Sequence, residues 1–465
     1  MLMPPSVADW LPEDHLAWFV IDVVDELDLS EFIATYRADG RGGAAYHPSL
    51  MVTLLVYAYA VGERSSRRIE RRCVEDVAFR VVAANQVPDH ATVARFRANH
   101  ETALAGLFGQ VLSLCARSGV LRPGLVAIDG TKLAANASKE ANRTAEQLAK
   151  EILEEAAAVD AAEDEAEAER GGDVAAGLGT RGPQRRARLR AMLDDLEQDA
   201  ADKSYDAHMA RRAEIEADTG RPIRGRRPKP DSEAHRSRRH ANTTDPDSRL
   251  MRTRDGFVQG FNVQAVATED QFIVAAQATN DAADNPSFSP MITATKQNLR
   301  RAGEPRRVRR VVADAGYWSD TNVNTAGVET FIAPGKARRL GHLAETETKR
   351  AELLASVEAG NLTKDDAAAH LGVTRSRLNT LLRNRRHGSP PTLTASMIAK
   401  LDTPRGKNTY KKRSAIIEPV FAQIKHNRGI RSLSRRGLPA ADSEWKLIAA
   451  THNLLKLWRL DIAAA

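Results

Sequence analysis

Three carboxylates stand out by their positions in the sequence. Asp129 follows the apolar run LVAI, and Asp314 follows the run VVA. Short apolar runs of this kind predict buried strands, so we expect both acids at strand ends, close to loops. Glu418 is the single acid between Arg405 and Arg436, a stretch that holds ten Lys and Arg residues. Nearby opposite charges lower the pKa of a carboxyl group, so Glu418 is expected to stay ionised.

Together these acids could support phosphoryl transfer. Ionised carboxylates from three separate elements would form an oxygen-ligand site suited to Mg²⁺ or Mn²⁺. Two such ions about 3.5–4 Å apart can activate an attacking hydroxyl and stabilise the leaving oxygen. The Lys and Arg residues around Glu418 could hold a phosphate backbone. A single Asp at a strand end is as often a turn or capping residue, but the triplet in this order of elements favours a metal site.

The segments around the acids predict a mixed α/β core. Strands are expected at 125–128, in two runs within 256–280 that turn at 270–271, at 308–313 and at 329–333. Helices are expected at 287–302, 319–327, 410–427 and 443–460. Strands followed by alternating helices and strands indicate a mixed sheet with helices on both faces.

Residues 10–120 predict an all-helical region with a basic face. Pro48 opens one helix and Gly62 closes it; Ser65 or Ser66 caps a second, and Asp89 begins a third. The second and third helices carry Arg67, Arg68, Arg71, Arg72, Arg95 and Arg97. Short helices with a Gly turn and an Arg-rich face resemble a helix-turn-helix DNA-binding unit. The alternative is a helical bundle with solvated arginines.

Two insertions interrupt the predicted core. Residues 142–245 predict a helical hairpin followed by a Pro, Gly and Arg-rich linker. The linker contains Arg224, Arg226 and Arg227 in the string RGRRP, which resembles an AT-hook; a flexible basic tether is the alternative. Residues 336–404 predict a helical insertion with a second helix-turn-helix-like segment, in which Thr363 and Thr374 cap two helices and Arg375 and Arg377 could meet DNA. A purely structural insert is the alternative.

The charge distribution points to a polyanion partner. The chain of 465 residues has a formal charge of only +7. Nine acids in 151–170 offset eight Lys and Arg residues in 221–240 and ten in 405–436. Blocks of one sign on separate segments favour binding of nucleic acid by the basic ones. The chain has two cysteines, no apolar stretch that would span about 30 Å of hydrocarbon, and no visible signal peptide. We therefore expect a cytoplasmic protein without a disulfide framework.

Several strings carry a family resemblance. They are DGTKLAANAS (129–138), TDPDSRLM (244–251), GFNVQAV (260–266), ADAGYWSD (313–320), RSAIIEPVFAQIKHNRGIRSLSRRGL (413–438) and the N-terminal YAVGERSSRRIERRCVEDVAFR with PDHATVARFR. In this colinear order the chain resembles bacterial insertion-sequence transposases of the DDE type. These have an RNase H-like catalytic core and a helical N-terminal DNA-binding domain. The resemblance implies that Asp129, Asp314 and Glu418 are the three metal-binding acids.

The segment around Glu418 also resembles a Tyr-Arg-Glu-Lys signature of related DDE transposases. The matching residues are Tyr410, Arg413, Glu418 and Lys425, with the Arg-to-Glu spacing one residue longer than in the best-known form. Seven residues make about two helical turns, so Lys425 is expected on the same face as Glu418. Pro419 predicts a kink or a helix start at this point. The resemblance implies that Arg413 and Lys425 position phosphate.

The sequence therefore predicts a transposase with a DNA-binding domain at 1–120 and an RNase H-like α/β catalytic domain at 121–465, interrupted at 142–245 and 336–404. It would bind the terminal inverted repeats of its insertion sequence, cut with two Mg²⁺ or Mn²⁺ ions, and transfer the 3′-hydroxyl ends to target DNA. The expected partners are double-stranded DNA and a second copy in the DNA complex, in the bacterial nucleoid and not at a membrane. The arginines expected to contact DNA are Arg67, Arg68, Arg71, Arg72, Arg95, Arg97, Arg224, Arg226, Arg227, Arg375, Arg377, Arg428 and Arg431. A catalytically inactive DNA-binding regulator and a metal-dependent RNase H-like nuclease are the alternatives.

Overall fold

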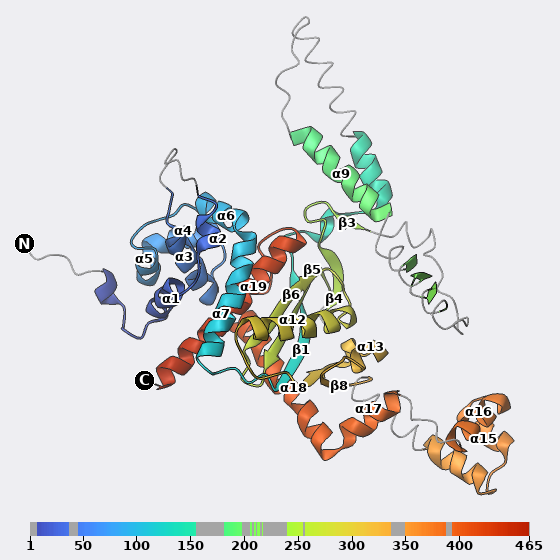
Figure 1. Cartoon of the computed structure of the whole chain (residues 1–465). Helices are drawn as coiled ribbons and strands as arrows, with labels where there is room; N and C mark the ends of the chain where they lie inside the picture. Colours follow the sequence, from blue (N-terminus) through green and yellow to red (C-terminus); the bar gives the residue numbers. More distant parts are fainter. Residues whose placement is uncertain are drawn as a thin grey trace, which may run out of the picture. The chain divides into compact units, whose positions relative to one another are not determined.

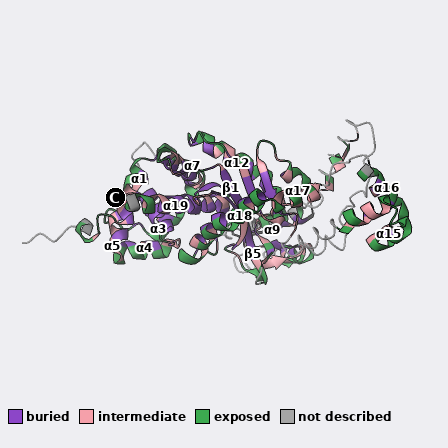
Figure 2. Ribbon diagram, turned by 90° about the horizontal axis from the view of Figure 1, so that it is seen from below, coloured by how far each residue is buried: buried purple, intermediate pink, exposed green. Residues whose placement is uncertain are grey.

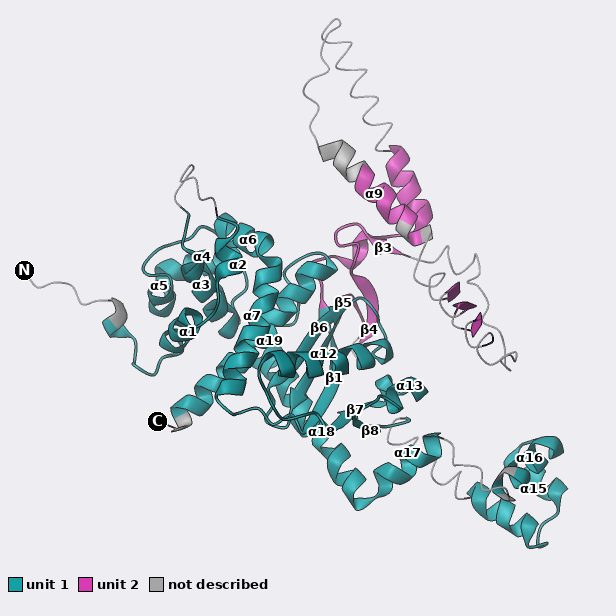
Figure 3. Ribbon diagram, viewed as in Figure 1, with its two compact units in different colours: residues 1–133, 261–465 teal, residues 134–260 magenta. Residues whose placement is uncertain are grey.

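The computed structural model describes residues 7–36, 45–154, 181–197, 240–253, 256–335, 349–386 and 393–464, with a few positions between 205 and 216. The chain divides into two compact units, shown in separate colours in Figure 3. One unit comprises residues 1–133 and 261–465, and the other comprises residues 134–260.

The described N-terminal region is helical, as predicted (Figure 1). Its helices are α1 (Leu16–Asp25), α2 (Ser30–Ile33), α3 (Pro48–Ala60), α4 (Ser66–Glu75), α5 (Val77–Val82), α6 (His90–Asn99) and α7 (Glu101–Arg117). Pro48 occupies the first turn of α3, where its missing N–H costs nothing. Asp89 caps α6 by accepting a hydrogen bond from the backbone N–H of Thr92 at 2.9 Å. Local capping signals therefore set these helix starts.

The chain beyond α7 forms a mixed sheet, which confirms the predicted α/β class. Its strands are β1 (Leu125–Ala134), β5 (Gly256–Thr268), β6 (Ile273–Thr279), β7 (Arg310–Ala313) and β8 (Glu329–Ile332). With β4 (Arg249–Thr253) they form a six-stranded sheet in the order β4-β5-β1-β7-β8, in which β6 also pairs with β5. The pairs β1–β7 and β7–β8 are parallel, and β5–β6 is antiparallel. One expectation is corrected: β1 does not end at Asp129 but continues for five residues beyond it.

Helices flank this sheet. The helix α12 (Phe288–Arg301) and the long α19 (Leu438–Ala464) both pack against β6, and α18 (Pro404–Ala422) lies against β7 and β8. The short α13 (Asp320–Val323) precedes β8, and α17 (Leu393–Asp402) precedes α18. The sheet and these helices enclose the purple core of Figure 2. None of the described helices is both long and apolar enough to cross a membrane.

The helix α18 passes through Pro419 without starting there, which corrects the expected break at Glu418. Proline has no N–H to donate to the carbonyl four residues earlier. That carbonyl, on Ala415, accepts instead from the side-chain Nε2 of Gln271 at 3.1 Å. The helix ends in a π-helical turn, η5 (Gln423–Asn427), which carries Lys425.

The second unit is built around a small sheet and two packed helices. The strands β2 (Asn142–Arg143) and β3 (Ala241–Asn242) pair antiparallel, and β4 (Arg249–Thr253) pairs with the first residues of β5. A helix over residues 145–154 and α9 (Arg181–Glu197) share an apolar contact formed by Leu148, Ile152, Leu189, Met192 and Leu196. The AT-hook-like arginines Arg224, Arg226 and Arg227 lie outside the described residues.

A three-helix element lies within the 336–404 insertion. A helix over residues 349–358 precedes α15 (Lys364–Leu371) and α16 (Arg375–Arg386). Thr363 caps α15, and Gly372 makes the turn between the two with a left-handed backbone at φ +60°. The three helices share an apolar centre of their own, which consists of Leu354, Ala367, Ala368, Leu378 and Leu382. The outer faces of α15 and α16 are largely exposed (Figure 2).

Candidate active site

The two predicted catalytic aspartates lie on neighbouring parallel strands. The register of β1 and β7 pairs Ala127 with Val312, so Asp129 and Asp314, each two residues further on, come level with each other. Asp314 directly follows β7 and caps the 3-10 turn Ala315–Tyr317 (η4) by accepting from the Gly316 N–H at 2.8 Å. Because the paired strands run parallel, equal steps from a paired position keep two residues side by side, which explains why the two acids converge.

Asp129 is a largely buried carboxylate with a raised pKa. Burial raises its pKa to about 6, the negative charge of Asp314 adds to that effect, and Arg413 opposes it. The Arg413 Nη1 donates to Asp129 Oδ2 at 3.1 Å, and the Gly130 N–H donates to Oδ1 at 2.8 Å. Two carboxylates side by side, one of them buried, form a site that favours a bound cation.

The guanidinium of Arg413 bridges the strand acid and the helix acid. Its Nη2 lies 3.5 Å from Glu418 Oε1, while its Nη1 holds Asp129. The side chain of Glu418 is 62% exposed, against 21% for Asp129. Tyr410, three residues before Arg413, is half-buried. Burial raises the pKa of its hydroxyl, the positive charge of Arg413 lowers that pKa, and the negative charge of Asp314 raises it. Asp129, Glu418 and Tyr410 thus meet around the guanidinium of Arg413.

Lys425 reaches the same strand by another route. Its Nζ donates to the Thr131 hydroxyl, and it lies 3.4 Å from the Lys132 carbonyl oxygen. Burial lowers the pKa of the Lys425 amine, and the charge of Arg431 adds to this. Thr131 is two residues beyond Asp129 on β1, so the structure places Lys425 beside the site. The π-helical turn that carries Lys425 could not be anticipated from the seven-residue spacing alone.

Asp284 is a site residue that the sequence did not reveal. It lies in the loop between β6 and α12, and its Oδ1 accepts hydrogen bonds from Lys132 Nζ at 3.1 Å, Asn262 Nδ2 at 2.8 Å and Gln264 Nε2 at 2.9 Å. It adds a third acid near Asp129. The string TNDAADNPSF contains two acids in a loop, and neither follows an apolar run, so no local pattern distinguished Asp284.

The donor chemistry of the site fits a hard divalent cation. Carboxylate oxygens are the ligands that Mg²⁺ and Mn²⁺ prefer, and the mutual repulsion of Asp129 and Asp314 would be relieved by positive charge. Within the part of the chain that the structure describes, however, no three His, Cys, Asp or Glu side chains are grouped closely enough to hold a metal ion. Arg413 lies between Asp129 and Glu418 and supplies the positive charge in this conformation.

Most of the predicted DNA-contacting arginines are exposed. On α4 and α6 these are Arg67, Arg68, Arg71, Arg72 and Arg95, and elsewhere Arg375, Arg377 and Arg431. Arg68 and Arg72 share the buried acid Glu63, at 3.1 and 3.9 Å. Arg375 pairs with Asp365 at 2.9 Å.

Two of the arginines predicted to contact DNA, Arg97 and Arg428, are buried, which corrects that prediction. The side chain of Arg97 donates to the Arg64 carbonyl at 2.8 Å and to the Ser66 hydroxyl at 2.6 Å. Arg428 donates to the Tyr59 carbonyl at 2.8 Å and to Thr451 at 2.6 Å. Both residues are only 7% exposed, so their guanidinium groups hold the fold together and do not face DNA.

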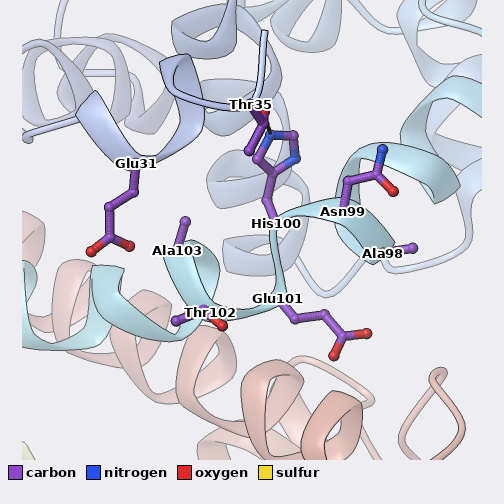
Figure 4. Close-up of a pocket in the computed structure, with 8 residues that line it drawn as sticks. All are labelled: Glu31, Thr35, Ala98, Asn99, His100, Glu101, Thr102 and Ala103. Atoms are coloured by element: carbon purple, nitrogen blue, oxygen red, sulfur yellow. Dashed lines mark hydrogen bonds between the residues drawn. The ribbon is translucent and has the colours of Figure 1, made fainter.

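A pocket of about 330 Å³ lies elsewhere, at the junction of α6 and α7. It is lined by Glu31, Thr35, Ala98, Asn99, His100, Glu101, Thr102 and Ala103 (Figure 4). The His100 ring is already engaged, by the Thr35 hydroxyl and the Phe96 carbonyl, each at 2.8 Å. None of the residues that converge around Arg413 lines this pocket.

Comparisons with known families agree with this geometry. A model described as a transposase domain matches residues 5–99, and a model described as a transposase DDE domain matches residues 374–458. The second match includes Tyr410, Arg413, Glu418 and Lys425. Comparison with curated proteins and with solved structures gives no significant match. The two family matches, at opposite ends of a chain with this mixed α/β core, support a DDE transposase of the insertion-sequence type.

Proposed function

We propose that this transposase binds the terminal inverted repeats of its insertion sequence, cuts at the element ends, and joins the freed 3′-hydroxyls to target DNA. The observation that carries the proposal is the convergence of Asp129 and Asp314, level on parallel strands, with Arg413 and Glu418 from α18. Chemistry at a phosphodiester needs anionic groups for cations and cationic groups for phosphate, and both kinds meet here.

The family generally uses divalent metal ions, and Asp129, Asp314 and Glu418 would hold two Mg²⁺ or Mn²⁺ ions in this protein. Such ions, when bound, lower the pKa of the attacking hydroxyl and stabilise the leaving oxygen. Arg413 would turn from the two carboxylates to the phosphate that enters the site. Lys425, next to Thr131, would hold a neighbouring phosphate. Tyr410 would orient Arg413 from the preceding turn of α18.

The exposed arginines supply the DNA-binding surfaces of the proposal. Arg67, Arg71 and Arg95 on the N-terminal helices, together with Arg431, would contact the phosphate backbone of the element ends. The α15–α16 element would bind either the ends or the target. Two ends must be brought together, so we propose a homodimer in the DNA complex. The proposed division at residue 120 separates the N-terminal DNA-binding helices from the catalytic domain.

The test is a strand-transfer assay with DNA that carries the inverted repeats, Mg²⁺ and a plasmid target. Asp129→Ala, Asp314→Ala and Glu418→Ala should each lose cleavage and joining by about 10³-fold or more, with DNA binding retained. Asp320→Ala, an exposed acid six residues from Asp314, is the matched control and should remain active.

Three outcomes separate the alternatives. Undiminished activity of Asp129→Ala or Glu418→Ala would remove these residues from the site. Repeat-specific binding without metal-dependent cleavage by the native chain would identify a DNA-binding regulator. Cleavage without joining, on DNA with or without the repeats, would identify a nuclease.

A further inference from the structure

The polar cluster around Asp284 lies on the opposite side of β1 from the catalytic helix. Successive side chains of a strand point to opposite faces of the sheet. Asp129 and Thr131 meet Arg413 and Lys425, which belong to α18 and η5. Lys132, the residue after Thr131, instead meets Asp284, which precedes α12.

We propose that Asp284 is a positioning residue that holds the backbone beside both catalytic aspartates. This inference rests on the proposed function. Its first support is that one oxygen, Asp284 Oδ1, accepts from three donors on two adjacent strands: Lys132 on β1, and Asn262 and Gln264 on β5. The side chains of Lys132 and Asp284 are only 15% and 25% exposed. Hydrogen bonds to a carboxylate are stronger than those to a neutral acceptor, so this one group ties the strands together.

The second support is the close approach of this cluster to Gly130. A Cβ on Gly130 would lie 2.2 Å from Gln264 Nε2 and 2.7 Å from Asp284 Oδ1. Only glycine therefore lets the chain lie directly against the cluster. The N–H of Gly130 also donates to Asp129 Oδ1, so the residue whose peptide holds the first aspartate lies directly against the cluster.

The third support is that the same residues reach the loop of the second aspartate. A Cβ on Gly316 would lie 3.3 Å from Asp284 Oδ2 and 3.0 Å from Asp314 Oδ1. The hydroxyl of Tyr317 donates to Gln264 Oε1, and Asn285 Nδ2 donates to the Trp318 carbonyl at 2.8 Å. Asp284 and its neighbours thus contact the segments on which both Asp129 and Asp314 lie.

The experiment measures the steady-state kcat and KM for cleavage of repeat-containing DNA by the full chain with Mg²⁺. Asp284→Ala should lower kcat about 100-fold, because a displacement of about 1 Å at a reacting group costs on this order. Its KM for DNA should change less than about threefold, since Asp284 is proposed to contact no DNA. Asp284→Asn keeps the shape and an acceptor oxygen and should recover activity to within about tenfold of the native protein. Gly130→Ala should reproduce the Asp284→Ala defect.

Asp281→Ala is the matched control, because Asp281 is an exposed acid in the same loop. A native kcat in Asp284→Ala would overturn the inference. So would an activity of Asp284→Asn no higher than that of Asp284→Ala, or a loss of activity in Asp284→Ala that comes equally from a higher KM for DNA. A second readout does not depend on the proposed function: hydrogen exchange of peptides covering 125–134 and 313–318 should accelerate in Asp284→Ala and not in Asp281→Ala. If Asp129→Ala keeps native activity while this exchange pattern is seen, the proposed function fails and the positioning contact stands. Unchanged exchange would overturn the contact itself.

Discussion

Arg413 determines the electrostatic state of the site. It neutralises a largely buried carboxylate, Asp129, that is repelled by Asp314, and it reaches Glu418 as well. A planar guanidinium can donate to two carboxylates at once, which a lysine ammonium does less well. The side chain therefore occupies the position in which a divalent cation would be attracted, and it must compete with that cation.

The competition predicts a specific effect of Arg413→Gln. Without the guanidinium, the repulsion between Asp129 and Asp314 is unshielded, so the variant should melt a few degrees lower in EDTA. Added Mg²⁺ should then raise its melting temperature by more than it raises that of the native protein. Thermal unfolding with and without Mg²⁺ measures both values. Equal Mg²⁺ shifts in the two proteins would contradict the competition, and Asp129→Ala, which lacks one proposed ligand, should show a reduced shift.

His452 should make the fold sensitive to mild acid. Its ring is buried, with Nε2 3.0 Å from the Gln271 carbonyl oxygen and Nδ1 3.0 Å from the Gln423 side chain. Burial lowers the pKa of His452 to about 3, from an ordinary value near 6.5. The unfolded chain therefore binds a proton that the folded chain excludes, and stability falls as the pH drops below about 6.5.

The loss of unfolding free energy from His452 approaches about 1.4 kcal/mol per pH unit, until the pH reaches the pKa of this residue in the folded chain. At pH 5 the native protein should have lost about 2 kcal/mol from this residue. His452→Gln should lose stability at pH 7 but show a smaller further loss between pH 7 and 5. Urea unfolding at the two pH values provides the measurement, and identical pH slopes would refute the assignment.

At the scale of elements, the helix α18 is completed by a hydrogen bond from a residue far away in the sequence. Pro419 leaves the Ala415 carbonyl without its helical donor, and Gln271 replaces that donor from the β5–β6 turn. Gln271 itself has a left-handed backbone at φ +63°. Asn tolerates this conformation, but its shorter side chain cannot reach Ala415. Gln271→Asn should therefore cost about 1–2 kcal/mol of unfolding free energy.

A second substitution tests the mechanism. Pro419→Ala restores a backbone donor to Ala415, so it should recover part of the loss in a Gln271→Asn background. The same change should gain less in the native background, where the carbonyl is already bonded. A double-mutant cycle by chemical denaturation measures the difference. Strict additivity of the two changes would show that the Gln271 contact does not compensate for the proline.

The arginines of α16 test whether the α15–α16 element binds DNA. Arg377 lies exposed near the start of α16, where a helix-turn-helix meets DNA, whereas Arg375 is paired with Asp365. Arg377→Ala should weaken binding to repeat or target DNA several-fold and lower the slope of log K against log salt by about 1. Arg375→Ala should have a smaller effect. Fluorescence anisotropy over a salt series measures both; no change in Arg377→Ala would favour a purely structural insert.

These elements show where prediction from sequence succeeded and where it stopped. The strands before Asp129 and Asp314 were predictable because apolar runs and turns are local signals. The continuation of β1 through the polar string DGTKLA was not, because its side chains are satisfied by distant partners such as Lys425 and Asp284. Arg97 and Arg428 fell in basic stretches, yet their partners are largely carbonyls and hydroxyls from remote segments. The passage through Pro419 depends likewise on Gln271.

At the scale of the whole molecule, the N-terminal helices and the catalytic core belong to one compact unit. The helix α7 packs along α19, and Arg64 pairs with Glu444 of α19 at 3.1 Å. Arg428, just after the catalytic helix, holds the Tyr59 carbonyl of α3. The helices proposed to bind DNA are therefore packed against the elements that carry the proposed active site, and their stabilities should be coupled.

Gly62 provides the test of this coupling. Its φ is +86°, and a Cβ there would lie 2.3 Å from the Arg428 carbonyl oxygen, which is backbone and cannot easily move. Gly62→Ala should therefore cost more than about 2 kcal/mol, from left-handed strain and the clash together. Gly119→Ala is the matched control: its φ is +69°, but nothing lies within 4 Å of its added Cβ, so only the strain of about 1 kcal/mol applies. Calorimetry should show the helical region and the core shifting together in Gly62→Ala. A loss no greater than that of Gly119→Ala, or a core transition that stays at its native temperature, would show that the two regions fold independently.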